Sequence, residues 1–251
     1  MIHAVPWDAP KGVKAYFTCR REGNSEGVYS SFNLGDHVDD SPENVAANRQ
    51  QLISSLSGLQ HIQWLEQVHG TAVYSIDGDV SAKPPRADAS ICALPNIACT
   101  VMTADCLPVL LTDVDGNQVA AVHAGWRGLC TGVLSQAIAA FDAPPNKLLA
   151  WIGPGISQRH FEVGAEVRTQ FLDQFELKRP GIEQCFLDSK KTGRYMADLP
   201  RLASQQMESL GLKNVARSAI CTYADAARFY SYRRDGQTGR FACLIYKTDA
   251  Q

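Results

Sequence analysis

Long hydrophobic runs and an excess of charge of one sign are both absent from this sequence. Its 251 residues carry a formal net charge of −2, with 45% hydrophobic and 20% charged side chains. No window approaches the roughly 20 apolar residues that a membrane-spanning helix needs. The near-neutral charge also argues against nucleic acid or an anionic membrane as the main partner. The opening residues, MIHAVPWDAPKG, lack the basic and apolar regions of a signal peptide, so we expect a globular, cytoplasmic protein.

Several short catalytic signatures are missing too. The sequence contains no CxxC pair, no HExxH and no GxxxxGKS/T, which argues against a dithiol redox centre, a zincin protease and a P-loop nucleotide site. Its eight cysteines are spread through apolar, strand-like segments, where each is expected to be a small buried side chain. Cys106 is the exception, because it follows Asp105 in a loop between two expected strands.

Turn residues and hydrophobic spacing predict a chain of mixed strands and helices. Strands are expected over residues 12–18, 62–76 (interrupted at Gly70), 150–155, 215–219 and 240–246, and helices over 41–58, 162–175 and 197–210. Residues 97–134 predict strand, loop, strand, turn, strand, loop and helix in that order. Hairpin signals outnumber βαβ signals, so we expect an α/β (α+β) fold with mixed sheets and outer helices. The whole of residues 1–251 is expected to form one domain.

The segment from Ile97 to Leu134 contains the strongest hairpin signal. Asp115-Gly116 lies between two apolar runs, which is typical of a tight β-turn. A two-residue turn there would place His123 opposite Pro108, with Cys106 as the diagonal neighbour roughly 7–8 Å away. Because Pro108 cannot donate a ladder hydrogen bond, we expect a bulge or a sheet edge at this position.

Three metal-binding residue types stand at strand ends or interruptions: His69, Cys106 and His123. Two imidazoles and a thiolate suit a divalent metal such as zinc, and three protein ligands would leave a fourth position open for catalysis. The alternative is a Cys106–His123 nucleophile–base pair, with Asp105, Asn33 or Gln67 orienting the imidazole. Residue types and spacing leave both chemistries open.

Eight strings in the chain resemble one known family. They occur in order between about residues 12 and 246 and read SFNLGDHVDD, WLEQVHG, RADAS, VMTADCLPVL, AAVHAGWRGL, WIGPGI, FEVGAEV and SYRRDGQTGR. The family is the YfiH type, whose members are called laccase-domain proteins, polyphenol oxidases, peptidoglycan editing factors or purine nucleoside phosphorylases. The resemblance implies layered mixed β-sheets flanked by helices. It also implies that His69, Cys106 and His123 bind a metal, Zn²⁺ or alternatively Cu²⁺, and that Cys106 and His123 are catalytic.

The family's names imply different activities. We expect a metal-dependent purine nucleoside phosphorylase for adenosine and inosine, with methylthioadenosine as a further candidate and with adenosine deaminase activity. The alternatives are a peptidoglycan-precursor editing amidohydrolase, which would use the metal or the Cys–His pair, and a copper-dependent polyphenol oxidase of laccase type. All six histidines are isolated and none forms a His-x-His pair, so multicopper oxidation is difficult to build from this set.

Phosphorolysis needs an anion site beside the sugar. We expect Arg20, Arg127 and the glycine turn Gly125–Gly128 to form it, because backbone N–H groups at a helix start favour anions. Asn33 and Gln67 are further substrate-binding candidates. One departure from the family is visible near Arg20, where the family's TRxGG pattern reads TCRREG here.

The arginine-rich segment near the end of the chain is the remaining basic feature. Arg233, Arg234 and Arg240 form either a basic rim or a solvated turn, and we favour the turn. The expected partners are therefore a small nucleoside and phosphate, without nucleic acid or membrane. The protein is expected to be a monomer or a weak homo-oligomer.

Overall fold

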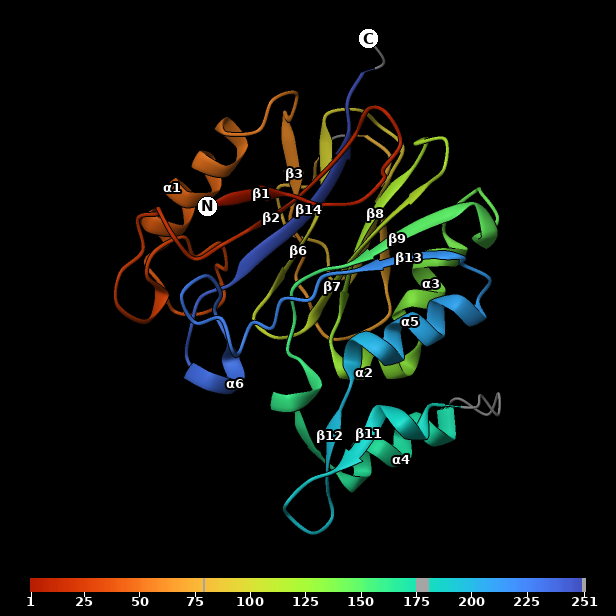
Figure 1. Cartoon of the computed structure of the whole chain (residues 1–251). Helices are drawn as coiled ribbons and strands as arrows, with labels where there is room; N and C mark the ends of the chain where they lie inside the picture. Colours follow the sequence, from red (N-terminus) through yellow and green to blue (C-terminus); the bar gives the residue numbers. More distant parts are fainter. Residues whose placement is uncertain (79, 175–180, 250–251) are drawn as a thin grey trace.

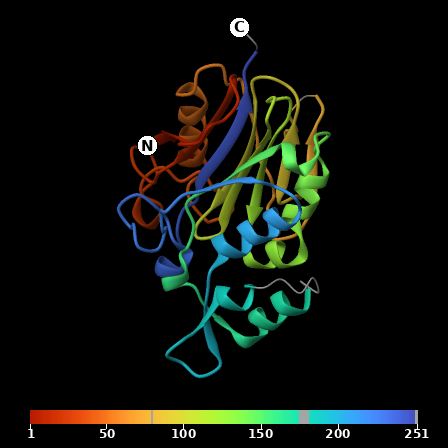
Figure 2. The same ribbon diagram turned by 45° about the vertical axis from the view of Figure 1, so that its right-hand side comes forward.

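The computed structural model describes residues 1–78, 80–174 and 181–249. Two β-sheets pack face to face, with α1 on one outer side and α2, α3 and α5 on the other (Figure 1, Figure 2). This arrangement confirms the predicted mixed α/β fold. The helices are α1 (Pro42–Ser54), α2 (Trp126–Thr131), α3 (Val133–Ala139), α4 (Ala165–Gln174), α5 (Leu199–Ser209) and α6 (Tyr232–Asp235). No helix in the described ranges is long and apolar enough to span a membrane.

Three sheets make up the β-structure. The five-stranded sheet has the order β1 (Ile2–Ala4), β2 (Val13–Thr18), β14 (Phe241–Lys247), β6 (Ile97–Thr103), β3 (His61–Gln63). The six-stranded sheet has the order β13 (Asn214–Arg217), β9 (Leu148–Ile152), β7 (Leu107–Asp113), β8 (Val119–Ala124), β5 (Ala89–Cys92), β4 (Val73–Ile76). A small sheet of β10 (Glu162–Gly164), β12 (Arg194–Ala197) and β11 (Phe186–Asp188) lies beside α4 (Figure 1).

Strand alternation divides the core into layers. In β7, Leu107, Val109 and Leu111 pack toward the helices, whereas Leu110 faces the space between the two large sheets. In β8, Val119 and Ala121 face the same inter-sheet space. Because side chains alternate along a strand, His123 is directed to this inter-sheet side at the end of β8.

The β7–β8 hairpin has the predicted register but a wider turn. Pro108 pairs with His123, as expected. The last pair is Thr112 with Val119, and the Asp113 carboxylate closes the intervening turn by accepting hydrogen bonds from backbone N–H groups within it. The predicted bulge or edge at Pro108 is wrong, because β7 lies between β8 and β9. Proline fits there because β9 pairing starts one residue later, and the Pro108 carbonyl accepts from Gly153 N at 2.8 Å.

The single strand predicted over residues 62–76 is wrong. Its two ends are β3 and β4, which belong to different sheets, and residues 64–72 form an irregular loop between them. Leu65, Gln67 and His69 therefore share no strand face, although their spacing suggested one. His69 has a left-handed backbone with φ of +59°, far from the extended values of regular β-strands.

The three predicted helices form, with differences at their ends: the first ends at Ser54, and the one predicted over 197–210 begins at Leu199, because Ala197 belongs to β12. Ser41 caps α1 by accepting from Asn44 N, as the Ser-Pro-Glu sequence predicts. The helix predicted from Glu162 begins only at Ala165, because residues 162–164 pair with β12. Its predicted end at Phe175 lies outside the described residues.

Candidate metal centre

His69, Cys106 and His123 meet at one end of the two sheets. One side-chain donor atom from each lies within 4.8 Å of the other two. Cys106 Sγ lies 3.8 Å from His69 Nε2, and the two imidazole rings meet edge to face with centroids 4.8 Å apart. His123 is buried, Cys106 is half-buried and His69 is exposed. The cluster therefore opens to solvent on the His69 side.

Asp88 supports two of these donors from behind. Its carboxylate is fully buried and accepts from His123 Nδ1 at 2.8 Å. The same carboxylate accepts from the backbone N–H groups of Val68, His69 and Gly70 at 3.2, 2.9 and 2.7 Å. With Nδ1–H committed to Asp88, the Nε2 lone pair of His123 is left for the centre. Asp88 thus fixes both the loop that presents His69 and the ring of His123.

Asp88 is also the imidazole-orienting residue, and the earlier candidates Asp105, Asn33 and Gln67 are wrong for that role. The sequence alone did not single out Asp88, because Arg86-Ala87-Asp88 is compatible both with a local charge pair and with a substrate contact. The available signal was a single acid directly before β5, whose residues 89–92 are all buried. A carboxylate at such a position must find buried donors.

Asp105 fixes the Cys106 loop from the opposite side. Its backbone is left-handed, with φ of +97°. The carboxylate accepts from Thr222 Oγ1 at 2.7 Å, Ser231 Oγ at 2.9 Å and Arg233 N at 2.7 Å. Its carbonyl accepts from Ile156 N at 2.9 Å. Three distant segments therefore determine where the Cys106 thiol points.

The charges of the protein groups alone favour a thiolate at Cys106 beside an imidazolium at His123. Burial alone would raise the pKa of Cys106, but the charges and hydrogen bonds of His123 and His69 outweigh it and lower that pKa. Burial alone would lower the pKa of His123, yet Cys106 and Asp88 raise it. The thiolate is the form that binds metal and acts as a nucleophile, so the protein stabilises the reactive state.

The donor set fits a divalent metal ion. Two imidazoles and one thiolate are ligands that zinc prefers, and three protein ligands leave an open coordination position. Gly125 adds to the fit, because a Cβ there would lie 2.7 Å from His69 Cδ2 and 3.1 Å from Cys106 Sγ. The glycine leaves the donors their room. Glycine is also needed at position 128, because a Cβ there would lie 2.8 Å from the backbone oxygen of Gly70.

Substituting alanine for Gly125 is expected to weaken metal binding about tenfold or more, because the new methyl group displaces the His69 ring and the thiol. Metal content after dialysis against a graded series of chelator concentrations measures this. Gly78→Ala is the matched control, since nothing lies within 4 Å of a Cβ at Gly78. Equal metal retention by both variants would contradict this account of Gly125.

Two of the predicted substrate contacts serve the scaffold instead. Gln67 clamps the backbone of Met102, donating to its carbonyl and accepting from its N–H, both at 2.8 Å. The fully buried Asn33 amide donates to Gly35 O and Asp40 Oδ2 and accepts from the N–H groups of Gly35 and Arg240. The Asn33 amide uses all of its donors and acceptors inside the protein and is not free to hold a substrate, whereas Gln67 keeps one N–H and one oxygen lone pair without a partner among the described residues.

In the described ranges, neither arginine predicted to cradle phosphate forms a hydrogen bond with the three donors. Arg20 donates to the carbonyls of Ser30 and Ala226, lies over the Tyr230 ring and lines a hollow of about 320 Å³ that includes none of the three donors. Arg127 is exposed and lies over the Trp126 ring, 4.6 Å from its centroid. The glycines on either side of Arg127, Gly125 and Gly128, have the steric explanation given above, so no anion is needed to account for them.

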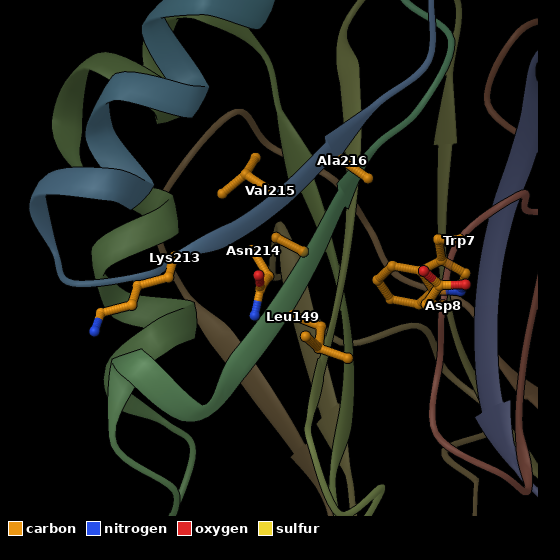
Figure 3. Close-up of a pocket in the computed structure, with 8 residues that line it drawn as sticks. Trp7, Asp8, Leu149, Lys213, Asn214, Val215 and Ala216 are labelled. Atoms are coloured by element: carbon orange, nitrogen blue, oxygen red, sulfur yellow. The ribbon is translucent and has the colours of Figure 1, made fainter.

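A larger hollow lies elsewhere, at the edge strand β13. Its volume is about 490 Å³, and Figure 3 shows Trp7 and Asp8 across it from residues of β9 and β13. None of the predicted site residues lines it. The donor cluster is therefore the candidate site, because it is the one place among the described residues where three or more metal-donor side chains converge.

Known proteins similar to this chain come from several bacteria. A family model described as multi-copper polyphenol oxidoreductase laccase matches residues 14–248. A Pseudomonas aeruginosa protein named purine nucleoside phosphorylase is 46% identical over 243 residues, covering 97% of each chain. The Escherichia coli (strain K12) purine nucleoside phosphorylase YfiH is 42% identical over 247 residues, covering 96% of each.

Solved structures agree with the fold. The Neisseria meningitidis protein NMB0706 superposes with a TM-score of 0.91 at 42% identity and covers 98% of this chain and 99% of its own. A Bacillus licheniformis protein called YfiH gives a TM-score of 0.87 at 28% identity, with 94% and 93% covered. The resemblance inferred from the eight strings is confirmed.

Proposed function

The chain belongs to the family described as multi-copper polyphenol oxidoreductase laccase, and we propose that it cleaves purine nucleosides with phosphate at the His69–Cys106–His123 centre. The names of its relatives from P. aeruginosa and E. coli support the reaction. The observation that carries the proposal is the open three-donor cluster with Asp88 behind it. We further propose that adenosine is deaminated there, with water replacing its exocyclic amine.

The chain's own residues supply orientation for this reaction. An oxygen of hydrogen phosphate forms a bond to the anomeric carbon of the sugar while the glycosidic bond breaks, and the purine leaves with the proton that the phosphate gives up. Asp88 keeps His123 Nε2 directed at the centre, and Asp105 holds the Cys106 loop in place. A divalent cation bound by the three donors, for which we propose zinc, would act as a Lewis acid that polarises a substrate oxygen.

Multicopper oxidation fits the donors less well. The sequence has six histidines, and none is two residues from another. In the part of the chain that the structure describes, one group of at least three histidine, cysteine or acidic side chains converges closely enough to hold an ion. A single three-donor centre suits one metal and a small polar substrate.

Incubating adenosine and inosine with the purified protein, with and without phosphate, tests the proposal. We expect adenine and hypoxanthine to be released only when phosphate is present, with the sugar recovered as its 1-phosphate. Chromatography of the bases and the sugar product measures this. Base release that is equally fast with and without phosphate would indicate hydrolysis instead. Inosine formed from adenosine as the sole product would leave only the deaminase activity. The absence of any product rejects both activities.

A further inference from the structure

We infer that Arg240, together with the hydroxyl of Thr238, forms the phosphate-binding part of this centre, in place of Arg20 and Arg127. The identity of the anion rests on the proposed phosphorolysis. The location rests on strand register, on hydrogen bonding and on the charges that surround Arg240. The sequence placed Arg240 in a solvated turn, which is wrong, because the residue is half-buried.

Strand pairing brings Arg240 to the same sheet end as Cys106. Strands β6 and β14 are antiparallel, and their last pair at this end is Thr103 with Phe241. One further step of the register sets Arg240 opposite Ala104, which is two residues before Cys106. Both chain segments therefore leave the same end of the same strand pair, where the donor cluster lies.

Arg240 lacks the counter-ion that comparable arginines have. Its Nη1 donates to the carbonyls of Thr238 and Gly239 at 2.8 and 3.0 Å. Among the described residues no carboxylate forms an ion pair with it, whereas the half-buried Arg49 and Arg234 pair with Asp36 and Asp235. A cation withdrawn from water is normally paired, because desolvation penalises the charged form.

The negative charges that act most strongly on Arg240 are those of Cys106 and Asp105, and the Asp105 carboxylate already accepts hydrogen bonds from other residues. Burial lowers the pKa of Arg240, and the charges that counter this effect most strongly are Cys106 and then Asp105. The Asp105 carboxylate is occupied by Thr222, Ser231 and the backbone of Arg233. The remaining guanidinium N–H groups are thus available to an external anion beside the cluster.

Thr238, two residues before Arg240, carries a second hydrogen-bond donor that the protein leaves unused. Its side chain is 1% exposed, and Oγ1 has no hydrogen-bond partner among the described residues. Its carbonyl is bonded to the Arg240 guanidinium, so the two residues are in contact. Buried hydroxyls are nearly always hydrogen-bonded. A guanidinium fork with an adjacent hydroxyl matches the oxygens of phosphate.

The backbone around Arg240 is held in advance. Its N–H donates to Asn33 Oδ1 at 2.8 Å, and a Cβ on Gly35 would lie 2.8 Å from Arg240 Cγ. This close packing gives Asn33 and Gly35 a positioning role for Arg240. Because the arginine stem is fixed before the anion arrives, less freedom is lost on binding.

Four variants of the full-length protein test the inference: Arg240→Met, Thr238→Val, Arg127→Met and the control Thr100→Val. Thr100 is the matched control because its hydroxyl is also buried without a partner. Inorganic phosphate binding is measured by calorimetry, and the phosphate and inosine KM values are measured separately. Arg240→Met is expected to weaken phosphate binding about tenfold or more, and Thr238→Val about threefold, because each loses a direct hydrogen bond. The inosine KM should change less than about twofold, and Thr100→Val should bind phosphate like the wild type.

Unchanged phosphate affinity in Arg240→Met overturns the inference, and phosphorolysis itself survives if the wild type releases base. Arg240-dependent phosphate binding without base release would keep the anion site and reject the proposed function. Loss of phosphate binding in Arg127→Met, with Arg240→Met unaffected, would return the anion to the start of α2 and overturn the inference. If Arg240→Met fails to fold, Thr238→Val decides, since valine preserves the threonine shape.

Discussion

Replacing Cys106 with serine is expected to abolish stoichiometric metal binding and to reduce phosphorolysis on the order of a thousandfold. A serine hydroxyl stays protonated at neutral pH, whereas His123 and His69 already lower the pKa of the Cys106 thiol against the effect of burial. The thiolate is also the softer ligand that zinc prefers. Elemental analysis of the purified variant and the nucleoside assay measure the two effects.

Cys221→Ser is the matched control for this change. Cys221 and Cys106 are the two half-buried cysteines among the described residues, and the other six are buried. Cys221 Sγ accepts from Ser157 N at 3.3 Å, a bond that a serine oxygen can also accept. Metal content and activity should match the wild type in this control. A metal-free wild type that is inactivated by Cys106→Ser would instead support the nucleophile–base pair of Cys106 and His123.

The parts of the centre that sequence patterns predicted are local ones. The hairpin register was predictable because Asp115-Gly116 lies between apolar runs, and register alone places His123 beside Pro108. The turn itself was predicted too tight, because the Asp113 carboxylate replaces backbone pairing at the end of the hairpin. A turn that is closed by a side chain cannot be recognised from the spacing of hydrophobic residues.

The incorrect predictions depend on partners far along the chain. Arg20 bonds to a carbonyl 206 residues away, and Asn33 accepts from a residue 207 away. Both residues form hydrogen bonds to distant parts of the chain, which no local pattern discloses. The loop that carries His69 was mistaken for a strand because its side chains alternate along the sequence as they do in a strand. The sequence does not show that the backbone N–H groups of this loop bond to one carboxylate and not to a neighbouring strand. The decisive carboxylate, Asp88, lies 19 residues after His69.

Replacing Asp88 with asparagine is expected to have the second large effect, destabilising the protein by about 3 kcal/mol or more. The fully buried carboxylate accepts from His123 and from three consecutive backbone N–H groups, and asparagine would turn an N–H group toward some of them. Metal affinity should fall about 10- to 100-fold, because His123 and the His69 loop lose their common support. Denaturant unfolding and chelator competition measure the two losses. Asp115→Asn, in the exposed turn, is the control and should change neither.

Acidification should remove the stability difference between the Asp88→Asn variant and the wild type. Burial alone would raise the pKa of Asp88, but the His123 and backbone hydrogen bonds outweigh it and hold that pKa below its usual value. A carboxyl group with a depressed folded-state pKa stabilises the protein above its unfolded pKa of about 3.9, and the contribution disappears as the pH falls through the folded value. The free energies of unfolding should therefore converge between about pH 5 and the acid limit of folding. A difference that stays constant down to that limit would mean that the shape of the aspartate, and not its charge, holds the His69 loop and His123 together.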